Sequence, residues 1–507
     1  MFSFIDRFLN NTTMYRVVLY YLLGLLLVAV VFSAVRILPY SPVGLLFSAL
    51  FITGVSWIAN SVFARVFRAQ TNVESVYITA LILTLIITPF SGSHAASYFS
   101  IAVWASVWAM ASKYIFAVKK KHLFNPAAFG VALTALTINQ AASWWVGTVS
   151  LLPFVLAGGI LMVRKLLRSD LVFSFLATAL VAALFLGIAA GQDIARLMSQ
   201  ALLDSPLFFF AFVMLTEPLT TPPTENLRMM YGMLVGFLFA PQVHLGSFYF
   251  SPELALIAGN VFSYLVSSKK KLILTLAERK KIGTDLYDFV FKTDEKLSFK
   301  PGQYLEWTLS HAHPDSRGNR RYFTIASSPT ERDVRMGVRF NPNPSSFKKA
   351  LGAMQKGDTI VASQLSGDFT LPRDKSKKLV LIAGGIGVTP IRSMVRYLAD
   401  MHDRRPIILL YSARTADDLA YRDVFDGAEQ SLGMKTIYTL TGEAPPGWKG
   451  ERGRIDGEMI RKRIPDYRER LFYISGTHAM VEHVKKVLHD MGVEKKNVKS
   501  DFFPGFA

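Results

Sequence analysis

The sequence predicts a multi-domain chain in which a polytopic α-helical membrane domain precedes an antiparallel β-barrel and then an α/β domain. The 507 residues are 51% hydrophobic with a mean hydropathy of +0.31, and the long apolar runs lie in the first half. Residues 1–268 hold only 14 Lys and Arg and 8 Asp and Glu, whereas the remainder holds 42 and 29. From Lys378 onward, apolar strand-like runs alternate with helix-like ones, which is typical of a parallel sheet.

Apolar runs in the first half predict about ten membrane helices. A bilayer core of ~30 Å requires ~20 apolar residues per helix. The clear runs are Val17–Val35, Val43–Ser61, Ser75–Phe90, Ile101–Ala117, Leu171–Ala190 and Leu254–Val266. Shorter or interrupted runs begin at Phe124 and Leu151, end at Leu215, and cover Met229–Ala240. We therefore assign residues 1–268 to a membrane domain.

Positive residues predict the orientation, because Lys and Arg concentrate on the cytoplasmic side of membrane proteins. Clusters fall at alternate ends of the predicted helices, with Arg36 as the one exception; they include Arg7 and Arg16, Arg65 and Arg68, residues 119–121, Arg164 with Lys165 and Arg168, Arg228, and residues 269–271. We expect a multi-pass protein of the cytoplasmic (inner) membrane with both termini in the cytoplasm. Its net charge of +19 would then face anionic membrane lipid, since no nucleic-acid recognition motif accompanies it.

Two polar interruptions of the apolar pattern predict a site inside the membrane domain. Asn125-Pro126 opens one helix, and three prolines with four threonines in Thr216–Thr224 break another. Irregular backbone at membrane depth is tolerated where it is buried in protein or lines a cavity. Residues 87–90 faintly echo residues 215–218, which suggests an inverted repeat of two five-helix halves with a site between them. The alternative is a pair of proline-kinked helices.

The chain contains no cysteine, which excludes thiolate-bound iron–sulfur clusters, disulfides and c-type haem attachment. We expect no metal site. In the membrane half, His94, His122 and His244 lie on different predicted segments, so no helix offers the paired histidines that two stacked haems require. The sequence therefore excludes two stacked haems, each bound by two histidines, in the membrane half.

Residues 10–268 resemble the NqrB and RnfD membrane subunits of sodium-translocating NADH:quinone reductase and of the Rnf complex. The resemblance rests on residues 124–127, residues 144–148 and Thr216-Glu217-Pro218. It implies FMN or riboflavin within the membrane domain, with Asn125 and Thr216 as cofactor-binding residues. By position it matches Thr148 to the threonine that carries a phosphoester-linked FMN, although residues 143–148 lack the Asp and Ala of the family's signature. As an alternative role for Trp144 and Trp145, we favour an aromatic anchor at the membrane interface.

A strand in the second half carries the residues expected to hold FAD. Arg320–Pro329 is rich in strand formers and ends at Ser-Ser-Pro. Alternation places Arg321 and Phe323 on one face, where a guanidinium can pair with a diphosphate and a ring can lie against a flat isoalloxazine. An ordinary barrel strand with a solvated Arg is the alternative. The pattern resembles the Arg-x-(Tyr/Phe)-(Ser/Thr) signature of the ferredoxin–NADP reductase family, which implies FAD binding by Arg321, Tyr322, Phe323 and Thr324.

The strand belongs to a predicted FAD-binding β-barrel domain over residues 269–375. Leu272–Glu278, Leu286–Lys292 and Tyr304–Leu309 read as further barrel strands. Ser345 and Ser346 begin a predicted helix, and in related reductases the corresponding position holds the FAD pyrophosphate. Their hydroxyls and the free amides of a helix N-terminus suit an anion. The same serines serve equally well as a simple N-cap.

Residues 376–507 are predicted to form an NAD(P)-binding α/β domain of the Rossmann-like kind. The strand Leu379–Ala383 runs into Gly384-Gly385-Ile386-Gly387-Val388-Thr389-Pro390. Glycines let backbone amides approach a diphosphate at the start of a helix. This loop resembles the ferredoxin reductase pattern Ala-Gly-Gly-x-Gly-x-(Thr/Ser)-Pro, which assigns cofactor binding to Gly384, Gly385, Gly387, Thr389 and Pro390. After the next strand, Arg414 either meets a 2′-phosphate, which would select NADPH, or is only solvated.

Two late segments are expected near the nicotinamide. Ser475-Gly476-Thr477, with Met480 beyond it, occupies the place where relatives often have Cys-Gly-Pro. The resemblance makes Ser475 a catalytic residue beside the hydride path, with Gly476, Thr477 and Met480 binding cofactor. Relatives also often place a C-terminal aromatic residue near the flavin. Here Phe503 is the choice for that role, against a plain hydrophobic tail.

Together these features predict a membrane-bound flavoprotein oxidoreductase. It would pass electrons from cytoplasmic NAD(P)H through FAD to flavin in the membrane, and on to quinone or to a periplasmic flavin- or haem-bearing acceptor. Other subunits of a redox complex are further expected partners. The competing interpretation is a transporter with a regulatory reductase domain, in which Glu217 serves as an ion site. A third combines the two, with electron flow driving Na⁺ or H⁺ movement.

Overall fold

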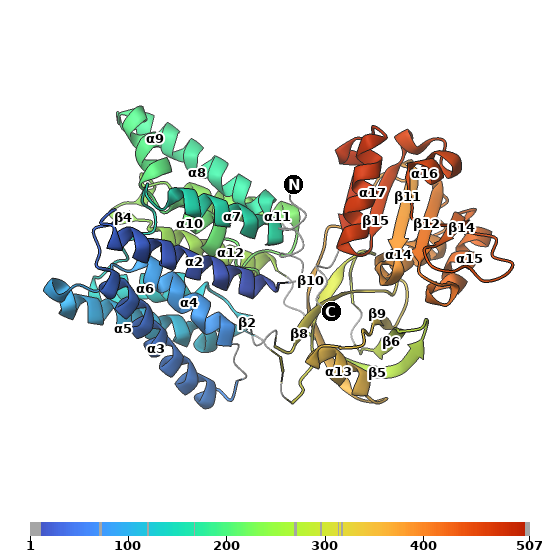
Figure 1. Ribbon diagram of the computed structural model, residues 1–507, viewed down its shortest axis with the longest axis horizontal. Helices are drawn as coiled ribbons and strands as arrows, with labels where there is room; N and C mark the ends of the chain where they lie inside the picture. The colour runs from blue at the N-terminus through green and yellow to red at the C-terminus, as the bar shows by residue number, and fades with distance from the viewer. Residues whose placement is uncertain are drawn as a thin grey trace. The chain divides into compact units, whose positions relative to one another are not determined.

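The chain divides into two compact units, residues Met1–Ser267 and Ser268–Ala507, and each is described by itself. The computed structural model (Figure 1) describes residues 12–69, 73–118, 121–166, 168–267, 271–294, 297–312, 314–315 and 318–501. Phe503, the expected C-terminal aromatic residue, lies outside these ranges.

The first unit is a bundle of helices around one apolar core (Figure 1). In chain order they are α2 (Met14–Ala34), α3 (Pro42–Val66), α4 (Val73–Ile86), α5 (Ala95–Ile115), α6 (Pro126–Ile138), α7 (Leu152–Leu166), α8 (Ser169–Ala189), α9 (Ile194–Leu203), α10 (Leu207–Phe209), α11 (Glu225–Phe239) and α12 (Pro252–Val266). A π-helical segment, η2 (Phe210–Met214), continues α10. Two short hairpins, β1–β2 (Ala117–Val118 with Lys121–His122) and β3–β4 (His244–Leu245 with Phe248–Tyr249), connect helices.

Four helices in the described ranges are long and apolar enough to cross a membrane: α2, α3, α5 with its preceding 3-10 turn, and α8. Helix α9 and the α10–η2 segment add a fifth span if they are counted as one helix bent by 49°. Helices α4, α6 and α12 are apolar but have fewer than 18 residues. The first unit therefore has the character of a membrane domain, and it mixes full-length helices with short ones.

Small residues let several of these helices pack closely. A Cβ placed on Gly130 of α6 would lie 2.3 Å from the Ala105 carbonyl oxygen of α5, and one on Gly236 of α11 would lie 2.6 Å from the Phe175 carbonyl oxygen of α8. Glycine at such contacts lets two backbones approach, which is a common way to pack helices in lipid. Helices α5 and α6 therefore pack closely against each other, as do α8 and α11.

The second unit begins with a six-stranded antiparallel barrel in the order β8-β7-β10-β5-β6-β9. Its strands are β5 (Leu272–Lys281), β6 (Leu286–Lys292), β7 (Tyr304–Thr308), β8 (Arg320–Thr324), β9 (Val334–Arg339) and β10 (Thr359–Ser366). Helix α13 (Ser346–Ala353) covers one end, where Phe347 and Leu351 join the barrel core. The predicted FAD strand is therefore β8, an outer member of the hydrogen-bonded order.

A parallel six-stranded sheet follows, with the order β14-β13-β12-β11-β15-β16. The strands are β11 (Leu379–Gly384), β12 (Ile407–Ala413), β13 (Lys435–Leu440), β14 (Glu451–Arg452), β15 (Leu471–Ser475) and β16 (Val498–Asp501). Helices α14 (Val388–Asp400) and α15 (Arg422–Leu432) pack on one face, and α16 (Gly457–Arg463) and α17 (His478–Asp490) on the other. From β11 the chain adds strands on one side as far as β14 and then returns to add β15 and β16 on the other side, so the switch point lies between β11 and β15. Ligands of such sheets bind at the carboxyl ends of the strands beside this switch point.

Candidate functional site

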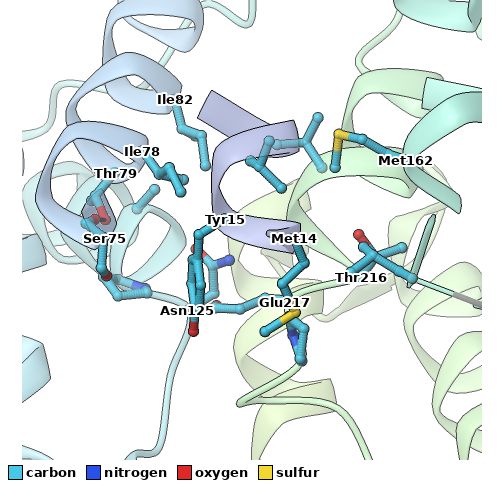
Figure 2. Close-up of a pocket in the computed structure, with 16 residues that line it drawn as sticks. Met14, Tyr15, Ser75, Ile78, Thr79, Ile82, Asn125, Met162, Thr216 and Glu217 are labelled. Atoms are coloured by element: carbon cyan, nitrogen blue, oxygen red, sulfur yellow. Dashed lines mark hydrogen bonds between the residues drawn. The ribbon is translucent and has the colours of Figure 1, made fainter. Parts of the chain in front are cut away.

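A cavity in the first unit brings together the two polar interruptions found in the sequence (Figure 2). It is lined by α2, α4, the start of α6, the end of α7 and the segment that follows η2. Asn125 and Thr216, both predicted cofactor residues, line the same cavity. Most of the remaining wall is apolar, as ring-binding sites usually are.

Asn125 fixes the start of α6 against two other segments. Its side-chain oxygen accepts a hydrogen bond from the Ala128 amide at 3.1 Å, as an N-cap. Its side-chain nitrogen donates to the Met214 carbonyl oxygen at 3.3 Å, and its backbone amide donates to Asn260 Oδ1 at 2.8 Å. The side chain is buried, so these bonds satisfy polar groups that water does not reach. Asn125 thus holds the broken ends of α6 and η2 together at the cavity.

The Thr216–Pro218 break supplies the other polar wall. The Thr216 hydroxyl donates to the Phe212 carbonyl oxygen at 2.7 Å, within its own segment. Glu217 Oε1 lies 3.0 Å from His122 Nε2. Figure 2 shows Glu217 and Thr216 across from Ser75 and Thr79 of α4. A carboxylate and a hydroxyl therefore lie on one side of a space whose wall is mostly apolar.

Trp144 and Trp145 are buried inside the unit, so the expectation of an interfacial anchor is wrong. The Trp145 indole donates to the Thr84 carbonyl oxygen at 3.0 Å, and the Trp144 backbone amide donates to the Ile86 carbonyl oxygen at 2.9 Å. These bonds satisfy carbonyl groups at the end of the short helix α4, which would otherwise be costly to bury. The Trp144 indole also donates to Glu253 Oε1 at 2.8 Å.

Thr148 lies in the loop that follows these tryptophans and is not among the residues that line the cavity. Its hydroxyl oxygen is buried and finds no hydrogen-bond partner among the described residues. An orphaned hydroxyl is compatible with a bound phosphate group there. The sequence resemblance assigned flavin binding to Asn125, Thr148 and Thr216, but of these three only Asn125 and Thr216 line the cavity.

In the second unit, strand β8 presents Arg321 and Phe323 toward α13. The Arg321 guanidinium lies 5.5 Å from the centre of the Phe347 ring, and the Phe323 ring lies 5.9 Å from the same ring. Both side chains therefore lie on one face of the strand, as alternation predicts. Tyr322 points to the other face, where its hydroxyl donates to Glu306 Oε2 at 3.0 Å. The structure thus separates Tyr322 from the predicted flavin pair.

Arg321 also reaches the N-terminus of α13. It donates to Asp315 Oδ1 at 3.0 Å, and the Ser346 backbone amide donates to Asp315 Oδ2 at 3.4 Å. A carboxylate is thus bound by the same kinds of group that bind a diphosphate. Ser345 acts as the N-cap, since its hydroxyl accepts from the Lys348 amide at 3.3 Å. Ser345 is therefore the N-cap of α13, which was the alternative to a role in FAD binding. The Arg321 guanidinium and the helix amides are the groups that bind an anion here.

Thr324, the last residue of β8, supplies a further observation on whether FAD fits here. It is buried, and its hydroxyl has no hydrogen-bond partner in the part of the chain that the structure describes. A buried hydroxyl without a partner, at the end of the strand that carries Arg321 and Phe323, suits a polar ring edge. The residues present on β8 and α13 therefore fit FAD: Arg321 for the diphosphate, with Phe323 and Thr324 for the ring system.

The glycine loop and the Ser475–Thr477 segment meet at the switch point of the parallel sheet. A Cβ on Gly387 would lie 2.6 Å from the Gly476 Cα, and one on Gly384 would lie 2.0 Å from Met480 Sδ. At Gly387 the neighbour is backbone, so only glycine fits there, whereas at Gly384 a larger residue would displace the Met480 side chain. The predicted residues Gly384, Gly387, Gly476 and Met480 are thus brought together, at the place where doubly wound sheets bind dinucleotides.

The other predicted residues of this sheet lie around the same edge. Thr389 and Pro390 are in the first turn of α14, and the Thr389 hydroxyl donates to the Ile386 carbonyl oxygen at 3.1 Å. Thr477 caps α17 by accepting from the Met480 amide at 3.4 Å. Gly385 has a φ of +53°, which glycine adopts at low cost. Arg414 is exposed at the end of β12.

Sequence reasoning missed two residues at this edge. Asp501 pairs in register with Ser475 at the ends of β16 and β15, and its Oδ2 is buried without a partner in the described ranges. Arg339 ends β9 in the barrel and its guanidinium lies 3.7 Å from where a Gly385 Cβ would be, with a buried Nε that has no partner in those ranges. Both were hidden in the sequence because only tertiary contacts bring them to the glycine loop. No local sequence signal marks Asp501, because its strand β16 reads Val-Lys-Ser-Asp.

Burial raises the pKa of Asp501 to about 7, from an ordinary value of 3.8. The folded state therefore favours the protonated form, and this contribution to stability is full below the unfolded-state pKa and lost as the pH rises through 7. At ~1.4 kcal/mol per pKa unit, the loss between about pH 4 and pH 8 is at most roughly 4 kcal/mol.

We expect Asp501→Asn to remove this pH dependence. The measurement is urea unfolding of the full chain in detergent at several pH values, followed by release of FAD fluorescence. The matched control is Asp490→Asn, whose carboxylate is exposed. Parallel pH profiles for the wild type and Asp501→Asn would contradict the assignment.

FAD, when bound, accepts a hydride from a nicotinamide and releases its electrons one at a time. This chain's own residues would bind and orient the two partners. Arg321 and the α13 amides would hold the diphosphate, Phe323 and Thr324 would contact the ring system, and the loop from Gly384 to Gly387 would admit the diphosphate of the nicotinamide coenzyme. Ser475 is buried at the end of β15, where its hydroxyl can orient the carboxamide of a nicotinamide.

Two family models match parts of the chain. Residues 142–271 match the NQR2, RnfD, RnfE family, and residues 381–486 match the oxidoreductase NAD-binding domain. A flavohemoprotein of Burkholderia sp. is 30% identical over 214 residues, which cover 41% of this chain and 52% of that protein. A glycine betaine monooxygenase reductase subunit of Chromohalobacter salexigens is 26% identical over 225 residues, which cover 43% and 60%. The chain thus spans about half the length of the curated relatives that it matches.

Among solved structures, the cytochrome b5 reductase domain of Ulva prolifera nitrate reductase aligns with 46% of this chain and 98% of its own, at 25% identity and a TM-score of 0.41.

Proposed function

We propose that this chain, a fusion of an NQR2/RnfD/RnfE-family membrane segment with an FAD- and NAD-binding oxidoreductase, carries electrons from NAD(P)H through FAD to a flavin inside the membrane unit. From there the electrons pass to quinone or to an acceptor on the outer face, which is a flavin- or haem-bearing protein or another subunit of a redox complex. The protein lies in the cytoplasmic membrane, with the reductase unit and both termini in the cytoplasm.

The single observation that carries this proposal is the cavity that joins Asn125 and Thr216. It lies inside a unit with the character of a membrane domain, in a chain whose other half is a reductase, and its wall combines apolar side chains with a few polar groups. Such a wall suits a flat heteroaromatic ring with hydrogen-bonding edges. FMN or riboflavin is the ring that follows from the family match. The orphaned hydroxyl of Thr148 is a second candidate site, for the phosphate of an FMN.

The helix order supports ten membrane segments in two inverted halves. The first half is α2 to α6, and the second is α7, α8, α10–η2, α11 and α12. In each half the third segment is short and ends near a break that contains threonine and proline. The break is Thr88-Pro89 in the first half and Thr216-Glu217-Pro218 in the second. In each half, too, the second segment packs on the fourth and the fourth on the fifth. Helix α9 has no buried residue and lies outside this scheme, at the bundle surface.

A transporter with a regulatory reductase is the second candidate, favoured by the Glu217 carboxylate at the broken segment. Ionisable groups at membrane depth often mark ion pathways. The two candidates differ in one testable respect, because a transporter requires no flavin in its membrane unit. A coupled pump, in which electron flow moves Na⁺ or H⁺, would need both the flavin and the carboxylate.

Filling the cavity tests the flavin proposal. Val18 of α2 lines the cavity, and we expect Val18→Trp to displace the membrane flavin while the chain retains FAD and oxidises NAD(P)H with a soluble acceptor. Leu27→Trp, on the same helix but 64% exposed, is the matched control and should keep both flavins. Flavins are extracted and quantified separately in each variant. Full retention of the second flavin in Val18→Trp would exclude this cavity as its site.

A further inference from the structure

Ionisable side chains from four different segments gather at one end of the cavity. Glu217 follows η2, His122 belongs to β2, Lys113 lies in the last turn of α5, and Tyr15 lies in the first turn of α2. Glu217 and Tyr15 line the cavity directly. The proposed function assigns a redox ring to this space but gives these groups no role.

Glu217 is held by a partner that can itself exchange protons. Its Oε1 lies 3.0 Å from His122 Nε2, and its Oε2 lies 3.5 Å from the Thr220 hydroxyl, which donates to it. The His122 side chain is 11% exposed and the Glu217 side chain 22%. A largely enclosed carboxylate thus lies against a histidine, which is the side chain that most readily gains and loses a proton near neutral pH.

The other charged and titratable groups around Glu217 come from the elements packed against it. The Lys113 ammonium donates to both the carbonyl and the hydroxyl oxygen of Ser75, at 3.1 Å each, and Ser75 lines the cavity. The Glu217 charge acts electrostatically on Lys113 and on the buried Tyr231 of α11. The Tyr231 hydroxyl accepts from Asn260, which in turn accepts from Asn125. Lys113 thus contributes a positive group and Glu217 a negative group here, and the Arg16–Glu74 ion pair lies next in sequence to the lining residues Tyr15 and Ser75.

Adding an electron to a ring in such a space places a negative charge near Glu217. In a low-dielectric environment, a nearby like charge strongly favours the protonated form of a carboxyl group. Electron arrival must therefore draw a proton to the site, or else the electron is disfavoured. Of the groups that line the cavity, Glu217 is the carboxylate, and its Oε1 lies within hydrogen-bond distance of an imidazole nitrogen.

We propose that Glu217 takes up one proton when the ring in this cavity gains one electron, and that His122 delivers that proton. The proposal rests on the proposed function, since it requires a redox ring in the cavity. One electron arrives from the FAD of the reductase unit. One proton passes from His122 Nε2 to Glu217 Oε1, and the imidazole recovers a proton from water at its other nitrogen. When the electron leaves for the acceptor, the proton on Glu217 leaves as well.

The test is a redox titration of the membrane flavin in the full-length protein in lipid nanodiscs, between pH 6 and pH 9. The wild-type midpoint potential should fall with pH by up to about 59 mV per unit, which is a tenfold change in proton concentration converted for one electron. Glu217→Gln should make the potential nearly independent of pH. Asp170→Asn is the matched control, because this carboxylate pairs with Arg228 in the same unit and does not line the cavity, and it should keep the wild-type slope.

Two further readouts do not depend on the stability of the Glu217 variant. In wild-type protein, a redox difference infrared spectrum should gain a carboxylic-acid C=O band on reduction. In His122→Gln, the slope of potential against pH should persist, while reduction of the membrane flavin after mixing with NAD(P)H slows by tenfold or more.

The outcomes distinguish a failure of the role given to Glu217 from a failure of the proposed function. A second flavin whose potential has the same pH slope in Glu217→Gln as in the wild type overturns the role of Glu217. Absence of the infrared band in the wild type overturns it equally. A protein that purifies with FAD alone contradicts the proposed function, and this inference fails with it.

Discussion

Replacing Arg321 by Ala is expected to strip FAD from the reductase unit. Arg321 lies at the N-terminus of α13 and binds a carboxylate there with its guanidinium, in contact with the same helix amides that suit a diphosphate. A hydrogen bond to a charged group contributes ~1.5–3 kcal/mol, so FAD affinity should fall roughly 10- to 150-fold. NAD(P)H oxidation at limiting FAD should fall in proportion. Arg321→Lys should have an intermediate effect, because an ammonium keeps the charge but lacks the paired N–H donors of the planar guanidinium.

Arg320→Ala is the matched control. Arg320 precedes Arg321 on β8, and its guanidinium lies 3.5 Å from Glu306 on the opposite face. FAD affinity is measured by fluorescence titration of the protein after flavin removal, together with the FAD content as purified. If Arg321→Ala bound FAD as tightly as Arg320→Ala, the assignment of β8 and α13 to the diphosphate would be wrong.

Replacing Arg392 by Met is expected to cause the largest loss of stability in the reductase unit. Arg392 of α14 is 4% exposed, and it bonds to Glu331 and, at 2.9 Å, to the Ala326 carbonyl oxygen in the barrel. It thereby ties the barrel to the parallel sheet. Removing one partner of a buried ion pair costs ~3–5 kcal/mol, because the other charge stays buried without compensation.

The double variant Arg392→Met with Glu331→Gln should recover much of this loss, since no unpaired charge then remains. Arg396→Ala, one turn further along α14, removes an exposed pair with Asp400 and should cost less than about 1 kcal/mol. The measurement is urea unfolding followed by release of FAD fluorescence. An equal loss of unfolding free energy in Arg392→Met and Arg396→Ala would contradict the large contribution assigned to the buried ion pair.

The same pair gives a pH dependence of known sign. Burial opposes ionisation of Glu331, but hydrogen bonds and the charge of Arg392 outweigh it, so the pKa of Glu331 lies below its ordinary value. The stability that this group contributes is present above the unfolded-state pKa and is lost as the pH falls through the folded-state pKa. The difference between wild type and Arg392→Met should therefore shrink on acidification below about pH 4.

The reductase unit was largely predictable from sequence because its signals are local. The strand around Arg321 and the loop from Gly384 to Thr389 combine a strand, a turn and a helix start within a dozen residues, and each lies where the pattern places it. Asp501 and Arg339 were not predictable in this way. Their importance comes from neighbours more than 25 residues away in sequence, such as Ser475 for Asp501.

The membrane unit was less predictable because hydropathy cannot distinguish a lipid-facing residue from a buried one. Trp144 and Trp145 looked like interfacial aromatics, yet they satisfy the buried end of α4. Helix α9 was missed because its apolar residues lie on one face of an amphipathic segment. By contrast, the polar breaks at Asn125 and Thr216 were recognisable, since polar residues and proline inside an apolar run require a structural reason.

The central claim is that electrons pass through two flavins, one in each unit, and flavin extraction tests it most directly. Detergent-purified full-length protein is denatured, its FAD, FMN and riboflavin are quantified separately, and a denaturing gel is inspected for flavin fluorescence. The account predicts FAD together with FMN or riboflavin, and a fluorescent band that Thr148→Ala abolishes if the FMN is covalently attached. FAD alone would contradict the account, because the membrane unit would then hold no electron carrier.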